Sequence, residues 1–299
     1  MTLHLNVFLS FLSFNSHTYV SSKDTSFLMP NPSMKTIMTN IPISRGHTPL
    51  PESQTLHLPR ILCLHGGGVT GDVFRAQARA LINYLPDFRL VFADGPFYCD
   101  PGPGIVPVYQ DCGPFRRWLR WLPEHPEIDN ESATEEVMYA IETCKREDEG
   151  TGPWVGLMGF SQGAKLASSL LYDQQIRIEK EGKAKTDYKF AVMLAGRSPI
   201  VSFCEWSKSP ACVDAGAVSE GFKFEGESPH ILRIPTIHVH GLADQGLHLH
   251  QKMMKQYHDP KSVTLVEWDG THRVPIKKTD VEKITDQIYR VAREHGVDV

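Results

Sequence analysis

The chain of 299 residues lacks the short patterns that usually bind metals and nucleotides. Its six cysteines form no C-x-x-C pair and show no zinc spacing. It also has no G-x-x-x-x-G-K-[ST] loop and no G-x-G-x-x-G fingerprint, so the common phosphate-binding loops are absent. We therefore expect no cofactor and no metal. A zinc site built on the pairs His238/His240 and His248/His250 is the alternative, which no further carboxylate cluster supports.

The chain also lacks a strong charge of either sign and a long apolar run. A net charge of −4 argues against nucleic acid as the main partner. The apolar stretch at residues 5–14 is similar to the core of a signal peptide, but no Lys or Arg precedes it and it is too short to span a bilayer. We therefore expect no membrane span and a cytoplasmic location with reduced thiols, with secretion as the alternative.

Two parts of the chain differ in composition. Residues 1–55 are rich in Ser, Thr, Asn and Pro and have no strong periodicity, which predicts a disordered N-terminal extension. Residues 56–299 instead alternate short apolar runs with segments of helical periodicity. The sequence therefore predicts a single folded domain behind an extension.

Strands and helices alternate along this domain. Strands are expected at 60–64, 89–93, 154–158, 188–194, 235–240 and 263–268, and helices at 73–84, 131–147, 163–180, 247–257 and 279–295. Such alternation predicts the α/β class, with a mostly parallel sheet and helices on both faces. In these sheets a ligand crevice lies at the carboxyl ends of the strands.

The pentapeptide Gly159-Phe160-Ser161-Gln162-Gly163 lies between an expected strand and an expected helix. This G-x-S-x-G pattern is typical of a sharp turn that presents a serine hydroxyl at the N-terminal end of a helix. Glycines are needed there because a Cβ at either position would collide with the adjoining strand or helix. Ser161 is therefore the candidate nucleophile.

A serine hydroxyl needs a base to take its proton and an acid to orient that base. In the chain order typical of this turn, Asp or Glu follows the serine and His comes last. Asp244 follows the strand expected at 235–240, and His272 follows the strand expected at 263–268. Both therefore fall at the same sheet edge as Ser161, as the candidate acid and base.

Two other acids compete with Asp244. Asp269 is too close in sequence to His272 to approach the far side of the imidazole comfortably. Glu267 is expected within the strand. Asp244 is therefore preferred.

Two backbone N–H groups are expected to stabilise a developing oxyanion. One belongs to Gln162, the residue after the serine. The other comes from the glycine-rich loop after the first strand, where Gly67 is preferred and Gly68 and Val69 are the alternatives. His65 is expected to brace this loop by hydrogen bonds.

Two insertions are expected to build a pocket. One runs from Tyr98 to Trp121 within an irregular stretch at 97–128, and the other runs from Ser198 to Phe224 and includes a helix or lid at 199–218. Their aromatic residues are the candidate lining: Tyr109, Phe115, Trp118, Trp121, Phe203, Trp206 and Phe222. The run 115–122 has apolar residues on one helical stripe, which predicts an amphipathic helix or a lid. Its arginines, Arg116, Arg117 and Arg120, are expected on a solvated face, and contact with an acidic carrier domain or a phosphopantetheine arm is the alternative.

Together these segments resemble the fungal serine hydrolase (FSH) family of α/β-hydrolases. The similar segments are Leu62 to Gly68, Asp94-Gly95-Pro96, Gly159 to Ala164, Gly241 to Asp244 and Gly270 to Pro275, within about residues 58–295. The resemblance implies an α/β-hydrolase fold with lid-like insertions and assigns Ser161, Asp244 and His272 as nucleophile, acid and base.

The resemblance also implies a function. Some family members are thioesterases that release a polyketide from its synthase in secondary-metabolite biosynthesis. We therefore expect cleavage of an acyl thioester or ester through an acyl-enzyme, with an acyl substrate on a polyketide synthase carrier domain. The alternatives are a general carboxylesterase of small esters and a non-catalytic binding protein on a hydrolase fold.

Overall fold

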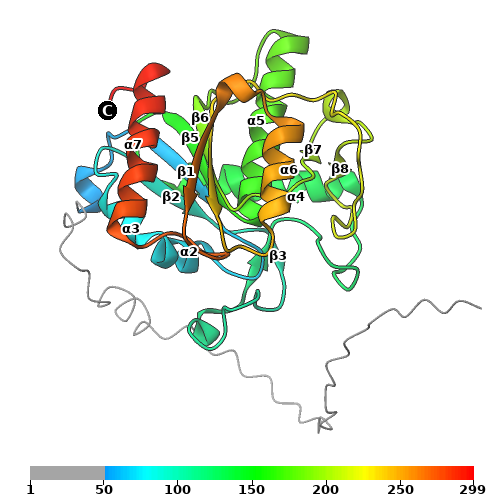
Figure 1. Ribbon diagram of the computed structural model, residues 1–299, viewed down its shortest axis with the longest axis horizontal. Coiled ribbons are helices and arrows are strands. Elements are labelled where there is room, and N and C mark those ends of the chain that lie inside the picture. The colour runs from blue at the N-terminus through cyan, green and yellow to red at the C-terminus, as the bar shows by residue number, and fades with distance from the viewer. Residues whose placement is uncertain (1–50) are drawn as a thin grey trace, which may run out of the picture. The chain divides into compact units, whose positions relative to one another are not determined.

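The computed structural model describes residues 51–299 (Figure 1). Most of the extension predicted over residues 1–55 therefore lies outside the described residues. Its last residues form a 3-10 turn, η2 (Glu52–Gln54), and Thr55 Oγ1 accepts a hydrogen bond from Arg89 at 2.8 Å. Within the described range no helix combines the length and apolar character that crossing a bilayer requires.

The central sheet consists of parallel strands in the order β10-β9-β6-β5-β1-β2. These are β1 (Arg60–Leu64), β2 (Arg89–Ala93), β5 (Trp154–Phe160), β6 (Phe190–Leu194), β9 (Thr236–Gly241) and β10 (Val263–Trp268). The chain adds β2 on one side of β1 and all later sheet strands on the other side, so the order reverses between β1 and β5. A ligand crevice is expected at the carboxyl ends of the strands at such a switch point. The predicted parallel sheet is confirmed.

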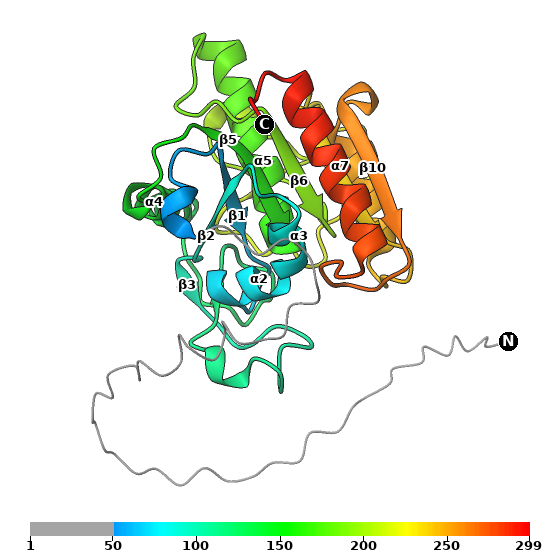
Figure 2. The ribbon, with the colours of Figure 1, turned by 90° about the vertical axis from the view of Figure 1, so that its left-hand side faces the viewer.

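Helices cover both faces of the sheet, as Figures 1 and 2 show. One layer contains α4 (Asn130–Glu147), α5 (Gln162–Glu181) and α6 (Leu247–Tyr257), and the other contains α2 (Gly71–Gln77), α3 (Arg79–Asn83) and α7 (Lys278–Glu294). The prediction of a single helix over residues 73–84 is wrong, because two short helices cover this segment. The helix ends after α2 and restarts as α3 because the buried residue between them, Ala78, has the non-helical backbone angles φ −86° and ψ 4°.

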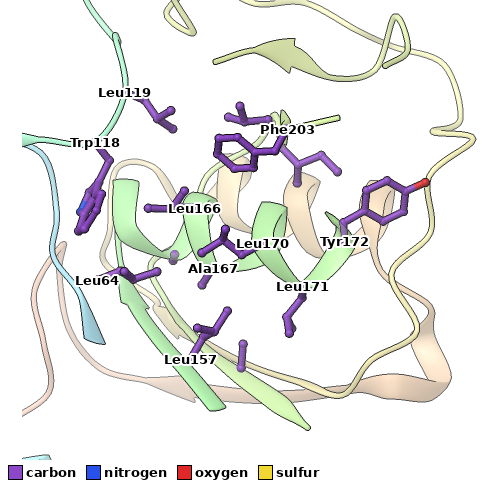
Figure 3. Packing of buried hydrophobic residues seen from close by; sticks show 14 of the residues in the cluster. Leu64, Trp118, Leu119, Leu157, Leu166, Ala167, Leu170, Leu171, Tyr172 and Phe203 are labelled. Carbon is purple, nitrogen blue, oxygen red and sulfur yellow. The ribbon is translucent and has the colours of Figure 1, made fainter. Parts of the chain in front are cut away.

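The strands send alternate side chains into two cores. Leu62 and Leu64 of β1 pack in the core that contains α5. Ile61 and Cys63 pack in the core that contains α7. Figure 3 shows the first of these cores, to which Leu64 of β1 and Leu166 of α5 both belong. Each fully buried side chain of this size contributes about 2 kcal/mol. Burial on both faces explains why the strands read as continuous apolar runs in the sequence.

Two irregular insertions join sheet elements. The first holds β3 (Phe97–Tyr98), η3 (Gln110–Cys112) and β4 (Arg116–Arg117), with β3 and β4 antiparallel. The second holds β7 (Val201–Ser202), η4 (Glu205–Ser207) and β8 (Val213–Asp214), with β7 and β8 parallel. The stretch 199–218, expected as a helix or lid, is thus formed of short strands and one 3-10 turn. A last 3-10 turn, η5 (Pro260–Ser262), precedes β10.

The helix predicted over residues 115–122 does not form. Arg116 and Arg117 pair with β3 instead. The next two backbone N–H groups, of Trp118 and Leu119, are donated to the side chain of Gln162. The backbone bonds that a helix would have used are therefore made with residues distant in sequence, and the prediction of an amphipathic helix is wrong.

The prediction that the three arginines lie on a solvent-exposed face is wrong for two of them, Arg117 and Arg120. Arg117 is only 2% exposed, and its guanidinium lies 4.6 Å from the ring centre of Phe97. Arg120 is also buried. Arg116 is partly exposed and lies over the ring of Tyr98. Because Arg117 and Arg120 are buried, neither is free to meet a carrier domain.

Candidate active site

Ser161 occupies the turn between β5 and α5. Its φ of +53° and ψ of −111° are backbone angles that residues other than glycine rarely adopt. Its N–H donates to the carbonyl of Leu194 in β6 at 2.8 Å, and its carbonyl accepts the N–H of Ala164 at 3.1 Å. Strain of this kind costs about 1–3 kcal/mol and persists where surrounding bonds enforce it. The turn thus holds the hydroxyl at the carboxyl edge of the sheet.

The two glycines of the pentapeptide leave no room for side chains. A Cβ at Gly159 would overlap the carbonyl of Gly163, and a Cβ at Gly163 would overlap the carbonyl of Leu64 in β1. Both obstacles are backbone atoms, so no change of rotamer could relieve them. The turn is therefore packed directly against its neighbouring strand, as the sequence predicted.

The imidazole of His272 lies between Ser161 and Asp244. His272 Nε2 is 3.0 Å from Ser161 Oγ, and His272 Nδ1 is 2.7 Å from Asp244 Oδ2. The other carboxylate oxygen of Asp244 accepts the N–H of Gly246 at 2.7 Å. Ser161 follows β5, Asp244 follows β9 and His272 follows β10. The structure thus brings together the three residues proposed from the sequence.

The competing acids lie elsewhere. Glu267 is exposed on β10, and Asp269 is exposed in the loop that follows. Neither forms a hydrogen bond with His272 in the part of the chain that the structure describes. The acid in contact with the imidazole is therefore Asp244.

Burial and hydrogen bonding act in opposite directions on Asp244. Its side chain is 1% exposed, which disfavours its charge, but the N–H of Gly246 and the imidazole of His272 outweigh this and lower its pKa. Burial lowers the pKa of His272 below 6.5, an effect that Asp244 opposes and Arg197 reinforces. At neutral pH the pair is therefore a carboxylate beside a neutral imidazole, which can accept a proton at Nε2.

One group of side chains could hold a metal ion among residues 51–299. Ligand atoms of Asp244, His250 and His272 lie within 4.8 Å of one another. Of the histidine pairs considered from the sequence, only His250 belongs to this group. A cation there would compete for the atoms that link Asp244 to His272.

The N–H groups of Gln162 and Gly67 have no acceptor among the described residues. Gln162 is the first residue of α5, and the first N–H groups of a helix have no partner within it. Both residues line the pocket that contains Ser161. Gly68, one of the alternatives, already donates to the carbonyl of Arg116 at 2.9 Å. The N–H of Val69, the other alternative, has no acceptor among residues 51–299 either, but Val69 lies one residue beyond Gly68 along the loop.

His65 braces the glycine-rich loop after β1. Its Nδ1 lies 2.6 Å from the carbonyl oxygen of Gly66, and its Nε2 accepts the N–H of Gly95 at 2.9 Å. Complete burial lowers the pKa of His65 to about 4, so the ring is neutral. The bracing role expected from the sequence is confirmed.

A pocket of about 980 Å³ contains Ser161 and His272. Of the aromatic residues expected to line it, Tyr109, Trp121 and Phe222 do so. The others lie elsewhere: Phe115, Trp118 and Phe203 are in the core and Trp206 is exposed. Both insertions thus contribute to the pocket, which has the size and aromatic lining of a site for an organic ligand.

The sequence motifs indicate no role for two polar side chains near Ser161, those of Gln162 and Lys165. The Gln162 amide bonds to the backbone of Trp118 and Leu119 and so ties the first insertion to the turn. Lys165 lines the pocket although it is 7% exposed. The signal that could have indicated Lys165 is a single charged residue within the run 164–171, whose other residues are uncharged.

Comparison with known proteins agrees with this geometry. The family model described as serine hydrolase (FSH1) matches residues 55–284. Esterase mpl1 from Monascus purpureus is 46% identical over 282 residues, which cover 91% of this chain and 87% of that protein. Esterase citA from Monascus ruber is 49% identical over 249 residues, which cover 81% of this chain and 95% of that protein.

Among solved structures, the carboxylesterase from Mesorhizobium loti has 17% identity and a TM-score of 0.46, covering 80% of this chain and 91% of that one. The fold assignment itself follows from the sheet order and from the family match. With a serine on the strand–helix turn and an imidazole in contact with it, the chain belongs to the serine hydrolase (FSH1) family, as the resemblance in its sequence predicted.

Proposed function

We propose that this serine hydrolase cleaves an acyl ester or thioester through an acyl-enzyme formed on Ser161. The observation that supports this most directly is the continuous contact from Ser161 Oγ through His272 to Asp244, inside the pocket. Such contacts turn a weakly nucleophilic hydroxyl into a reactive one.

The proposed reaction has two halves. Ser161 Oγ attacks the acyl carbonyl carbon while His272 Nε2 takes the hydroxyl proton, and His272 then gives this proton to the leaving alcohol or thiol. In the second half His272 takes a proton from water, which attacks the acyl-enzyme and releases the acid. Asp244 holds the proton on Nδ1 and stabilises the imidazolium. The N–H groups of Gln162 and Gly67 stabilise the oxyanion, by about 3 kcal/mol each.

The preferred substrate, in our proposal, is an acyl chain on a polyketide synthase carrier domain. The volume of about 980 Å³ and the aromatic lining from both insertions support a large acyl group. The family resemblance supports the thioester. A general carboxylesterase of small esters is the second candidate, favoured by the names of the curated relatives, which are called esterases.

A fluorophosphonate probe tests the catalytic assignment. The wild-type protein should be labelled at Ser161, and Ser161→Ala should lose both labelling and turnover while its circular dichroism spectrum stays unchanged. A wild-type protein that is not labelled would be a binding protein on a hydrolase fold. Turnover near the wild-type rate in Ser161→Ala would show that another nucleophile acts.

A matched substrate pair tests the thioester assignment. One acyl chain is offered both as a p-nitrophenyl ester and as a pantetheine thioester. Turnover of the thioester supports release from a carrier. Turnover of the free ester alone would remove the thioesterase proposal and leave the carboxylesterase.

We also infer a cytoplasmic location. All six cysteines lie within the described residues, and all are free thiols. Reduced thiols are usual in the cytosol, where disulfides are rare. Fractionation of cells that express a tagged full-length chain would test this, and recovery in the medium would favour secretion.

A further inference from the structure

Lys165 is a buried cation beside the candidate nucleophile. It lies one helical turn after Ser161 in α5, is 7% exposed and lines the pocket. Its ammonium group has no hydrogen-bond acceptor and no ion-pair partner among residues 51–299. An unpaired buried charge is costly, and buried charges in proteins are normally paired. The pocket wall therefore holds a cation that lacks an acceptor.

Arg197 supplies a second cation to the same pocket. It follows β6, and its Nε is buried without an acceptor in the described part of the chain. Its guanidinium packs on Gly246, where a Cβ would lie 2.7 Å from Nη2. The guanidinium therefore fits in this place because residue 246 has no side chain. Since Gly246 also bonds to Asp244, one loop positions both the acid and this arginine.

No carboxylate of the described residues neutralises this pair. Asp244 and Glu220 line the pocket but form no ion pair with either cation. Burial, followed by the charge of Arg197, lowers the pKa of Lys165 to about 7. Near neutral pH about half of the Lys165 side chains are therefore charged, and a bound carboxylate would favour the charged form. In contrast Lys252, which lines the same pocket, pairs with Glu225 at 3.3 Å. Arg79 and Arg273 also line the pocket, but Arg79 donates to the carbonyl of Ala76 at 3.0 Å and the guanidinium of Arg273 lies over the ring of Trp268. Lys165 and Arg197 are therefore the two lining cations for which the described residues supply no such contact.

We propose that Lys165 and Arg197 bind a carboxylate on the acyl part of the substrate. This inference rests on the proposed function, because it specifies the substrate class of the same site. Ammonium and guanidinium groups form charge-assisted hydrogen bonds with carboxylates. The substrate is then a half-ester or half-thioester of a diacid. Water adds to its acyl carbon, the bond to the alcohol or thiol breaks, and a diacid leaves.

Position favours this carboxylate over the phosphate of a phosphopantetheine arm. Lys165 lies directly after the turn, and its N–H donates to the carbonyl of Ser161 at 3.2 Å. Lys165 and Ser161 therefore line the same part of the pocket wall, so an anion bound by Lys165 belongs to the acyl part next to the carbonyl that Ser161 attacks. An extended phosphopantetheine arm places its phosphate much farther from the thioester sulfur. The phosphate is accordingly the competing source of the anion in the test.

Two esters of equal length test the proposal. Mono-p-nitrophenyl adipate carries a carboxylate, and p-nitrophenyl adipamate carries a neutral amide in its place. Wild-type kcat/KM should be higher for the acid by about tenfold, the effect of about 1.4 kcal/mol of binding. Lys165→Met should remove this preference by lowering kcat/KM for the acid alone, and Arg197→Gln should reduce it. Lys252→Met, whose lysine already has a partner, should keep it.

Equal wild-type activity on both esters would overturn the proposal, as would an equal loss on both in Lys165→Met. A third arm compares the pantetheine and phosphopantetheine thioesters of one neutral acyl chain. A preference for the phosphorylated arm that depends on Lys165 would overturn the carboxylate assignment in favour of phosphate. Failure of the proposed function looks different, because neither ester would then react and Ser161 would not be labelled by a fluorophosphonate.

Discussion

The side-chain oxygen of Gln162 accepts the backbone N–H of Trp118 at 2.7 Å and that of Leu119 at 3.2 Å. The amide nitrogen of Gln162 donates back to the carbonyl of Leu119 at 3.2 Å. One side chain thus joins the turn that holds Ser161 to the insertion that contributes Trp121 to the pocket. Ser161 and part of the pocket wall are therefore held in one bonded unit.

Gln162→Leu should separate these two parts while keeping the Gln162 backbone N–H proposed for the oxyanion. The buried N–H groups of Trp118 and Leu119 would lose their acceptor, so the free energy of unfolding should fall by about 2 kcal/mol. KM should rise because Trp121 is no longer held in place. Urea unfolding and steady-state kinetics measure the two effects.

Gln174→Leu is the matched control for Gln162→Leu. The Gln174 side chain binds the N–H and the carbonyl of Tyr188 at 2.8 and 2.9 Å, and it does not line the pocket. A similar loss of stability with unchanged KM is expected. If Gln162→Leu also leaves KM unchanged, the proposed link between the turn and the pocket is wrong.

Asp244→Asn should lower kcat by about 10⁴-fold, because an amide donor in place of the carboxylate favours the wrong tautomer of His272. Steady-state rates on a p-nitrophenyl ester provide the measurement. Asp269→Asn is the control and should leave kcat unchanged, since Asp269 is exposed and does not contact His272. The opposite ranking of the two variants would move the acid to Asp269.

The pH dependence follows from the pKa of His272, which burial lowers below 6.5. The imidazole must be neutral to accept the serine proton, so activity is lost only as the pH falls through this lowered pKa. The profile of kcat/KM should therefore have its acidic midpoint below pH 6.5. Arg197→Gln should shift this midpoint upward, because the positive charge of Arg197 lowers the same pKa. A wild-type midpoint above 6.5 would contradict the burial argument.

Ser161→Gly should be more stable than Ser161→Ala by about 1 kcal/mol, because glycine adopts a positive φ without strain and alanine does not. Urea unfolding of the two inactive variants gives the difference. The same pair of substitutions at Ser168, in the interior of α5, should give the reverse order, since glycine is the poorer helix former. A more stable Ser161→Ala would show that the turn is not strained.

The candidate site could be predicted from the sequence because its geometry depends mainly on where the parallel strands end and on the glycines beside Ser161. Parallel strands end at one edge, so a residue that follows a strand can be placed there without knowing the packing. Ser161, Asp244 and His272 each follow a strand that its apolar run reveals. The glycines around Ser161 then indicate a turn that packs too closely on its neighbours to leave room for a Cβ.

The insertions could not be predicted in the same way. The eight residues 115–122 have helical periodicity, yet their conformation is decided by strand β3 and by the Gln162 side chain, which lies 44 residues after Trp118. The burial of Arg117 likewise depends on the ring of Phe97 on a neighbouring strand. Local periodicity contains no information on such partners, so both errors concern residues held by non-local contacts.

The contact between Gly163 and the carbonyl of Leu64 has a consequence for how the molecule can change. Main-chain atoms touch there, so the serine and the loop after β1 cannot shift relative to each other without separating a strand from a helix. New acyl groups must therefore be accommodated by altering the two insertions. Mutant libraries confined to residues 97–128 and 197–222 should vary selectivity while the reacting groups stay in register.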